Sequence, residues 1–288
     1  MDHVIKPFLV FILAITGLMA GAKGDEPPAE RYKGLMKEFS QTARGLYEAK
    51  SDEERMAVAE KMVKLTPQFM ELGEKTPEQA VAMDGLTGVV VQEIWMENNT
   101  LYPGKEKDNL EDRAISLLLE RYIGSVKLGE VCTRVSYGFR KSCETLLRTA
   151  LEKSPHREVQ GMACLRLAQF LNNRMRRMDL LKDKPEMARR YQVLFGKDYL
   201  EGLDRMDRGV TTKEVEVIFE RAAREFADVK LPYNGSVGAT AKLELHEIRH
   251  LSVGKEAPEI EAADEDGKPF KLSGYRGRVV LLYFWSEY

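Results

Sequence analysis

Apolar residues recur at helical spacing through most of this chain. Residues three or four positions apart lie on one face of a helix, so this spacing predicts a series of amphipathic helices. The clearest stripes are Tyr32, Leu35, Met36, Phe39, Leu46 and Tyr47; Ile115, Leu118, Leu119, Tyr122 and Ile123; and Val215, Ile218, Phe219, Ala222, Ala223 and Phe226. Residues 162–171 are apolar nearly all round, which predicts a helix at the centre of the fold.

Helix-start signals divide this region. Residues 51–54 and 76–79 fit the capping box, in which two side chains three positions apart each satisfy an unpaired backbone N–H group. Pro77 would stand in the first turn, where its missing N–H costs nothing. Ser154-Pro155 and residues 211–214 are expected to open two further helices. The sequence thus predicts an α-helical domain over residues 29–250.

A short motif occurs twice within this domain. E-K-[TS]-P stands at residues 74–77 and 152–155, each time with a valine four residues beyond the proline. The recurrence suggests stacked helical hairpins, as in tetratricopeptide-like arrays. Two independent helix-start signals would also produce it, so both interpretations stay open. The predicted fold class is mainly α.

The first 22 residues have the features of a signal peptide. Lys6 supplies a positive charge, and the apolar run at residues 8–19 is shorter than the roughly 20 residues that a membrane span needs. Residues 20–22 match an A-x-A cleavage site, so the mature chain is expected to begin at Lys23. We expect an extracytoplasmic protein, periplasmic or secreted. It would contact a membrane only if this segment stays uncleaved.

Composition narrows the function classes. The chain has 288 residues, of which 43% are hydrophobic and 31% charged, as in a soluble globular protein of about two domains. The formal net charge of −2 argues against a nucleic-acid partner, which would require a dominant basic surface. A small basic cluster of Arg174, Arg176 and Arg177 is interpreted as a hydrated helix face rather than a phosphate site.

The three cysteines are too few for a disulfide scaffold. Cys132 and Cys143 would stand about 16 Å apart on one continuous helix, whereas a disulfide needs Cα atoms within about 7 Å. They can pair only if the chain turns near residues 136–138, and this pairing stays open. Cys164 is interpreted as a small buried hydrophobe. No catalytic role is expected for any of the three.

Residues 246–250 match H-E-x-x-H. On a helix, His246 and His250 share a face and can bind one Zn²⁺, with Glu247 as the general base of a metalloprotease. A catalytic zinc needs a third protein ligand, and Val253 and Glu256 stand where the metzincin pattern has Gly and His. A solvated helix end is therefore the preferred interpretation. We predict no catalytic, cofactor-binding or metal-binding residue and no cofactor, and a zinc metalloprotease is the third functional alternative.

After Ser252 the spacing of apolar residues no longer predicts helix and instead predicts extended segments. Residues 264–268 predict a hairpin turn with Gly267 at the position that needs a positive φ. Residues 279–284 form an apolar run with no polar face, which predicts a strand at the centre of a covered sheet.

This segment resembles the opening of the thioredoxin-like redoxin domain, which includes the alkyl hydroperoxide reductase/thiol-specific antioxidant group and the extracytoplasmic thiol:disulfide oxidoreductases. Such domains begin with G-x-x-A-P-x-[FI] and continue with D-G-x-x-[FV]-x-L-S-x-[LY]-[RK]-G-[KR]-V-V-L-L-x-F-W. The matching positions are Gly254, Ala257, Pro258, Ile260, Asp266, Gly267, Phe270, Leu272, Ser273, Tyr275, Arg276, Gly277, Arg278 and residues 279–285. The resemblance covers about the last 35 residues.

The resemblance implies a thiol chemistry whose reactive cysteines are not among residues 252–288. In that family a C-x-x-C pair follows F-W-x-x-[WY], and its first cysteine attacks as a thiolate at a helix N-terminus. Here Phe284 and Trp285 match, Tyr288 fills the aromatic position, and the sequence stops. We expect residues 252–288 to be the N-terminal fragment of a thioredoxin-like domain, truncated before the C-x-x-C and inactive as written.

Two functions from different classes therefore follow. The first is an extracytoplasmic thioredoxin-like redoxin with a helical N-terminal domain, whose partner would be a disulfide client. The alternative is a non-enzymatic helical scaffold that binds an extracytoplasmic protein partner.

Overall fold

The computed structural model describes residues 26–99, 110–232 and 235–286. Within these ranges the chain is mainly α, as predicted, with eleven α-helices and one two-stranded sheet. No described helix combines the length and apolar character that a membrane span requires. The predicted signal peptide, residues 1–22, lies outside the described residues.

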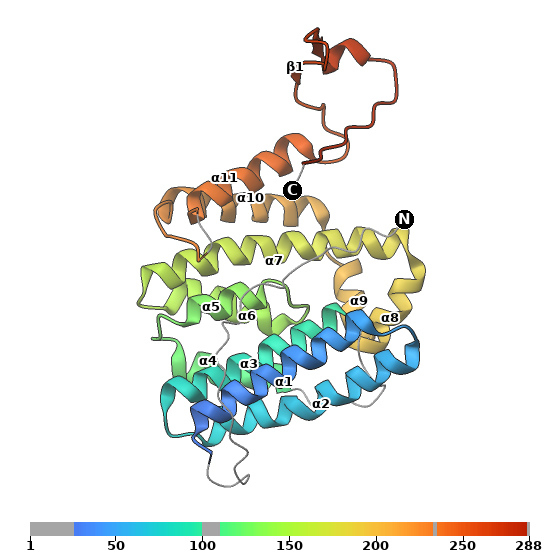
Figure 1. Ribbon diagram of the computed structural model, residues 1–288. Helices are drawn as coiled ribbons and strands as arrows, with labels where there is room; N and C mark the ends of the chain where they lie inside the picture. The colour runs from blue at the N-terminus through green and yellow to red at the C-terminus, as the bar shows by residue number, and fades with distance from the viewer. Residues whose placement is uncertain (1–25, 100–109, 233–234, 287–288) are drawn as a thin grey trace.

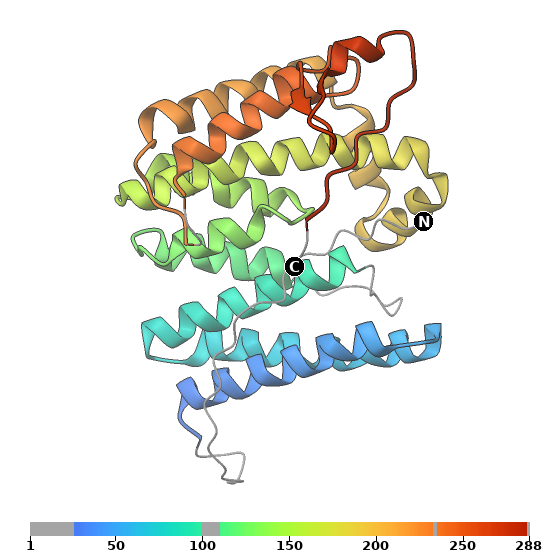
Figure 2. The same ribbon diagram turned by 45° about the horizontal axis from the view of Figure 1, so that its top comes forward.

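The helices follow one another as a stack (Figures 1 and 2). They are α1 (Pro28–Glu48), α2 (Asp52–Lys75), α3 (Gln79–Asn98), α4 (Leu110–Tyr122), α5 (Leu128–Val135), α6 (Lys141–Lys153), α7 (Arg157–Asp183), α8 (Pro185–Phe195), α9 (Lys197–Asp204), α10 (Arg208–Glu225) and α11 (Val237–His246). The layers run from α1 and α2 at one end to α10 and α11 at the other, and most helices pack against those next to them in sequence.

Helix α7 is the central element of the stack. It packs against α5 and α6 on one side and against α10 and α11 on the other, and near its C-terminal end it also contacts α8 and α9. Residues 161–165 are buried without interruption, so this part of the helix has no solvent face. The prediction of a central helix at residues 162–171 is confirmed.

One of the predicted helix starts is confirmed. Ser51 caps α2 by accepting a hydrogen bond of 3.2 Å from the Glu54 backbone N–H. In a capping box the Glu54 carboxylate would accept a hydrogen bond from the Ser51 backbone N–H. Here it accepts instead from the backbone N–H of the preceding residue, Lys50, at 2.6 Å.

The other three predicted starts are wrong by a few residues. Helix α3 begins at Gln79 and α7 at Arg157, each two residues after a proline, so Pro77 lies before its helix. The residue before a proline is restricted to extended backbone, and Thr76 and Ser154 each take this conformation and end the preceding helix. Helix α10 begins earlier than expected, at Arg208.

The early start of α10 has a clear local cause. Asp207 caps the helix by accepting a hydrogen bond of 2.8 Å from the Val210 backbone N–H. A carboxylate is a strong N-cap and also complements the helix dipole. Thr211 is thereby placed inside the first turn, where its hydroxyl donates to the Asp207 carbonyl at 2.8 Å.

Helices α2 and α3 approach closely through glycines. A Cβ atom added at Gly85 would lie 2.7 Å from the backbone nitrogen of Gly73 and 2.9 Å from the carbonyl oxygen of Phe69. At Gly88 it would lie 2.5 Å from the Phe69 ring. The absence of side chains at these positions therefore sets the distance between the two helices.

A β-hairpin follows the helices and projects beyond α11 (Figure 1). Strand β1 (Glu261–Ala263) pairs antiparallel with β2 (Pro269–Lys271), with Ala262 opposite Phe270. The turn between them has Gly267 at φ 77°, as predicted, and the 3₁₀-helix η2 (Leu272–Tyr275) continues from β2.

The predicted central strand at residues 279–284 is wrong for this structure. These residues have no regular secondary structure, and the exposed fractions of Val279, Leu281 and Phe284 are 104%, 90% and 84%. A strand requires a hydrogen-bonded neighbour, and no segment of the described ranges pairs with this one. The segment is apolar, as its sequence shows, but it pairs with no other segment of the described residues.

Candidate functional site

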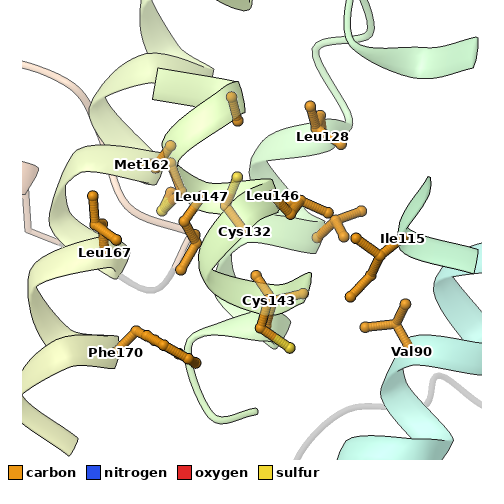
Figure 3. Packing of buried hydrophobic residues seen from close by; sticks show 14 of the residues in the cluster. Val90, Ile115, Leu128, Cys132, Cys143, Leu146, Leu147, Met162, Leu167 and Phe170 are labelled. Carbon is orange, nitrogen blue, oxygen red and sulfur yellow. The ribbon is translucent and has the colours of Figure 1, made fainter. Parts of the chain in front are cut away.

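The three cysteines are buried, unpaired thiols on successive helices. Cys132 lies on α5, Cys143 on α6 and Cys164 on α7. The chain does turn between α5 and α6, as a Cys132–Cys143 disulfide would require, yet both thiols are free. Figure 3 shows these two side chains within the apolar packing, with their sulfur atoms pointing to different sides.

The surroundings of these thiols oppose ionisation. Burial raises the pKa of Cys132 and of Cys164 to about 12. Burial, followed by the nearby Glu111 carboxylate, raises the pKa of Cys143 well above its ordinary value. Because the thiolate is the nucleophile in disulfide exchange, none of the three is prepared for it near neutral pH.

A buried ionic network surrounds Cys143. Arg140, the residue before α6, places its Nε 2.9 Å from Oε1 of Glu97 on α3 and 3.1 Å from Oε2 of Glu111 on α4. Both carboxylate side chains are 0% exposed. The Cys143 thiol donates to Oε1 of Glu111 at 3.1 Å. The network therefore joins three helices through charges that are removed from water.

The electrostatics of this network favour the charged guanidinium. Burial would lower the pKa of Arg140, but the adjacent carboxylates of Glu97 and Glu111 outweigh burial and raise it. A buried carboxylate is tolerated only when it is paired and hydrogen-bonded. Sequence reasoning missed these residues. The local signal in the sequence is Glu97, an acidic residue in a helix that is apolar on most sides.

A cluster of aromatic rings joins α8 and α9 to the rest of the stack. Phe139 stacks on Phe195 with ring centres 4.6 Å apart, and Tyr191 and Tyr199 complete the cluster. The Arg177 guanidinium lies 3.7 Å from the centre of the Phe139 ring, in cation–π geometry. The face of Phe139 that a cationic ligand would use is therefore occupied by the protein itself.

The predicted basic cluster is engaged in ion pairs and is not simply hydrated. Arg174 binds Glu144 at 2.8 Å, and Arg176 binds Glu247 at 2.6 Å. Arg177 donates to the Gly138 carbonyl at 2.7 Å in addition to its aromatic contact. These contacts tie α7 to α6, to the residues after α11 and to the loop before α6.

The H-E-x-x-H motif lies where α11 ends. His246 is the last residue of α11, and Glu247 begins a π-helix, η1 (Glu247–Leu251), which contains His250. Both imidazoles are exposed, with ring centres 4.8 Å apart and planes inclined by 41°. The described residues hold no group of three or more His, Cys, Asp or Glu side chains arranged to hold a metal ion. Glu247 is paired with Arg176 on α7, so its contacts do not support a role as a general base.

The chain was compared with protein-family models, curated proteins and solved structures, and no match was found in any of them. The functional argument therefore depends on the residues and contacts described above.

Proposed function

We propose that this chain comprises the helical domain and opening β-hairpin of an extracytoplasmic thioredoxin-like redoxin. The observation that carries the proposal is the exposed apolar run, defined as residues 279–285, which read V-V-L-L-Y-F-W. It follows the β-hairpin and η2, and this order of elements supports the resemblance.

The apolar run has the properties of a central strand without its sheet. Apolar side chains on both faces of a strand are stable when helices cover both faces and neighbouring strands pair with both edges. A contiguous apolar surface of this kind marks a contact that is missing from the isolated segment. The hairpin and η2 contact each other but do not cover the run.

The expected chemistry is thiol exchange by cysteines other than the three present here. In the redoxin family the reactive pair follows the F-W motif, whereas Cys132, Cys143 and Cys164 all precede it and are buried with raised pKa values. We therefore expect these 288 residues to reduce neither insulin disulfides nor peroxide. The partner of the active protein would be a disulfide client, and the signal peptide predicted at residues 1–22 would direct it out of the cytoplasm.

Two measurements test this proposal. The first is the DNA sequence beyond the codon for Tyr288, where we expect a C-x-x-C within a few codons in one of the reading frames. Unrelated sequence in all frames would overturn the proposal. The second is titration of the native chain with a thiol reagent near neutral pH, where we expect slow labelling that becomes complete in denaturant. Rapid labelling of one native thiol would contradict the assignment.

A second candidate is a tetratricopeptide-like scaffold that binds a protein partner. It is favoured by the two E-K-[TS]-P turns, which end α2 and α6 in the same extended conformation and start α3 and α7 at the same position after the proline. The sequential packing of the helices is also typical of repeat proteins, in which each hairpin contacts mainly its neighbours.

The two candidates make different predictions about partner binding. The immobilised chain is exposed to an extracytoplasmic extract beside a variant that carries Leu281→Lys and Phe284→Lys in the apolar run. A partner retained equally by both proteins favours the helical scaffold. A partner retained only by the unmodified chain binds through the apolar run and argues against the scaffold.

A further inference from the structure

We propose that His246 and His250 form a surface site that binds one divalent transition-metal ion, with water in the remaining coordination positions. This site is independent of the thiol chemistry proposed above. It differs from a protease centre, because it uses two protein ligands and assigns no role to Glu247 as a base, and it departs from the sequence-based prediction that no residue binds a metal.

The spacing of the two rings fits a chelated metal. An imidazole nitrogen binds zinc at about 2.0–2.1 Å, which places the metal roughly 3.2 Å from the ring centre. Two rings that bind one ion at angles between about 90° and 110° then have centres roughly 4.5–5.2 Å apart. The observed separation of 4.8 Å lies inside this interval. At this separation, one ion can be shared by ring nitrogens that side-chain rotation turns towards it.

The backbone that carries these rings is held from two sides. Glu247 binds Arg176 on α7 at 2.6 Å, and Arg249 binds Glu216 on α10 at 2.8 Å and also pairs with Glu220. Ile248 packs against the hydrophobic core. The three residues between the histidines are thus anchored to the helical stack, while both imidazoles remain exposed. A chelating pair on an anchored backbone loses less conformational freedom on binding than a pair on a mobile loop.

The ligand chemistry selects a class of ions. Neutral imidazole suits Cu²⁺, Ni²⁺ and Zn²⁺, whereas Mg²⁺ and Ca²⁺ prefer oxygen ligands. For the same pair of nitrogens the affinity is expected to be highest for Cu²⁺. Glu247 and the nearest acidic residues on α10 are already paired with arginines, so the site depends on the two imidazoles.

The test is a titration of the full chain, made without a polyhistidine tag, with CuSO₄ and separately with ZnSO₄. The background carries His3→Gln, because a histidine at position three binds Cu²⁺ together with the chain's amino terminus. Calorimetry should show one Cu²⁺ per chain. His246→Asn or His250→Asn should lower the affinity about tenfold or more, because the second ligand of a chelate acts at a high effective concentration.

His156→Gln is the matched control. The Nε2 atom of His156 already bonds to the Gly124 carbonyl at 2.9 Å, so this substitution should leave the affinity unchanged. In the chain that retains His156, His246 and His250, Cu²⁺ should broaden the NMR signals of the His246 and His250 imidazoles before that of His156. Equal affinity in the His246→Asn/His250→Asn double variant, or first broadening at His156, would overturn the proposal. Half an ion per chain in a dimer would show that the ion bridges two chains, and it would overturn the proposal of a site within one chain.

Discussion

At the scale of single residues, the structure removes several ionisable groups from water. Glu97 and Glu111 are buried beside Arg140, and the Cys143 thiol bonds to one of these carboxylates. A buried charge costs several kcal/mol unless a partner compensates it. The stability of the fold therefore depends on the guanidinium of Arg140 and on the thiols remaining protonated.

Replacing Arg140 tests the first dependence. In Arg140→Gln the two carboxylates lose the adjacent positive charge, so we expect a loss of about 3–5 kcal/mol in the free energy of unfolding. Arg148→Gln is the control, because the pairs of Arg148 with Glu144 and Glu214 are partly exposed and should contribute less than about 1 kcal/mol. Urea denaturation of both variants decides, and equal losses would contradict a special role for Arg140.

The raised pKa values of the buried thiols lead us to expect that the protein loses stability in alkaline solution. The folded state raises the pKa of Cys132 and Cys164 from near 9 to about 12, so the unfolded state releases these protons first. The stabilisation is complete below pH 9 and is lost as the pH rises towards 12. Each thiol should lower stability by about 1.4 kcal/mol per pH unit in that window.

Urea midpoints between pH 8 and pH 11 measure this effect. The variant that carries Cys132→Ala and Cys164→Ala should show a shallower decline with pH, even if its stability at pH 8 is lower. An unchanged slope would show that the two thiols do not control the alkaline transition.

At the scale of elements, the sequence predicts correctly those features that are determined by residues close together in the chain. The helical stripes, the central position of α7 and the Gly267 turn all follow from spacing within a few residues. Helix starts failed where neighbouring groups compete, as when Asp207 caps α10 ahead of Thr211. The strand at residues 279–284 failed because a strand is defined by its partner, and the buried network was missed because Glu97 and Arg140 are far apart in sequence.

The close contact between α2 and α3 predicts that replacing a glycine by alanine destabilises the protein at this contact and stabilises it at an exposed position. Gly85→Ala would push a Cβ atom against the backbone of Gly73 and Phe69, which cannot rotate away, so we expect a loss of about 1–3 kcal/mol. Gly34→Ala, on the exposed side of α1 with nothing within 4 Å, should instead stabilise by about 0.5–1 kcal/mol. Thermal unfolding compares the two, and similar effects would contradict the close approach.

At the scale of the whole molecule, a closely packed helical stack carries an exposed apolar run. One hydrophobic core joins α1 to α11 without a residue of α8 or α9, and the hairpin and the residues after it also lie outside this core. Stability and self-association should therefore respond to different substitutions.

Lysines in the apolar run test this separation. Leu281→Lys with Phe284→Lys should shift sedimentation profiles from larger species towards the monomer, because charge opposes pairing of exposed apolar segments. The melting temperature of the helices should stay unchanged. Val217→Lys, which replaces a single exposed valine on α10, is the control and should alter neither property. Persistent large species in the double variant would place the association elsewhere.

The central position of α7 also determines where the molecule can open. The layers of α5 and α6 and of α10 and α11 pack directly on α7, and residues 161–165 of α7 are all buried, so detaching either layer would expose apolar surface. Brief partial openings are therefore expected at α1, at the far end of the stack, and in the β-hairpin. The backbone amides of α7 should accordingly be the last to exchange with deuterium, and the amides of α1 and of the hairpin among the first.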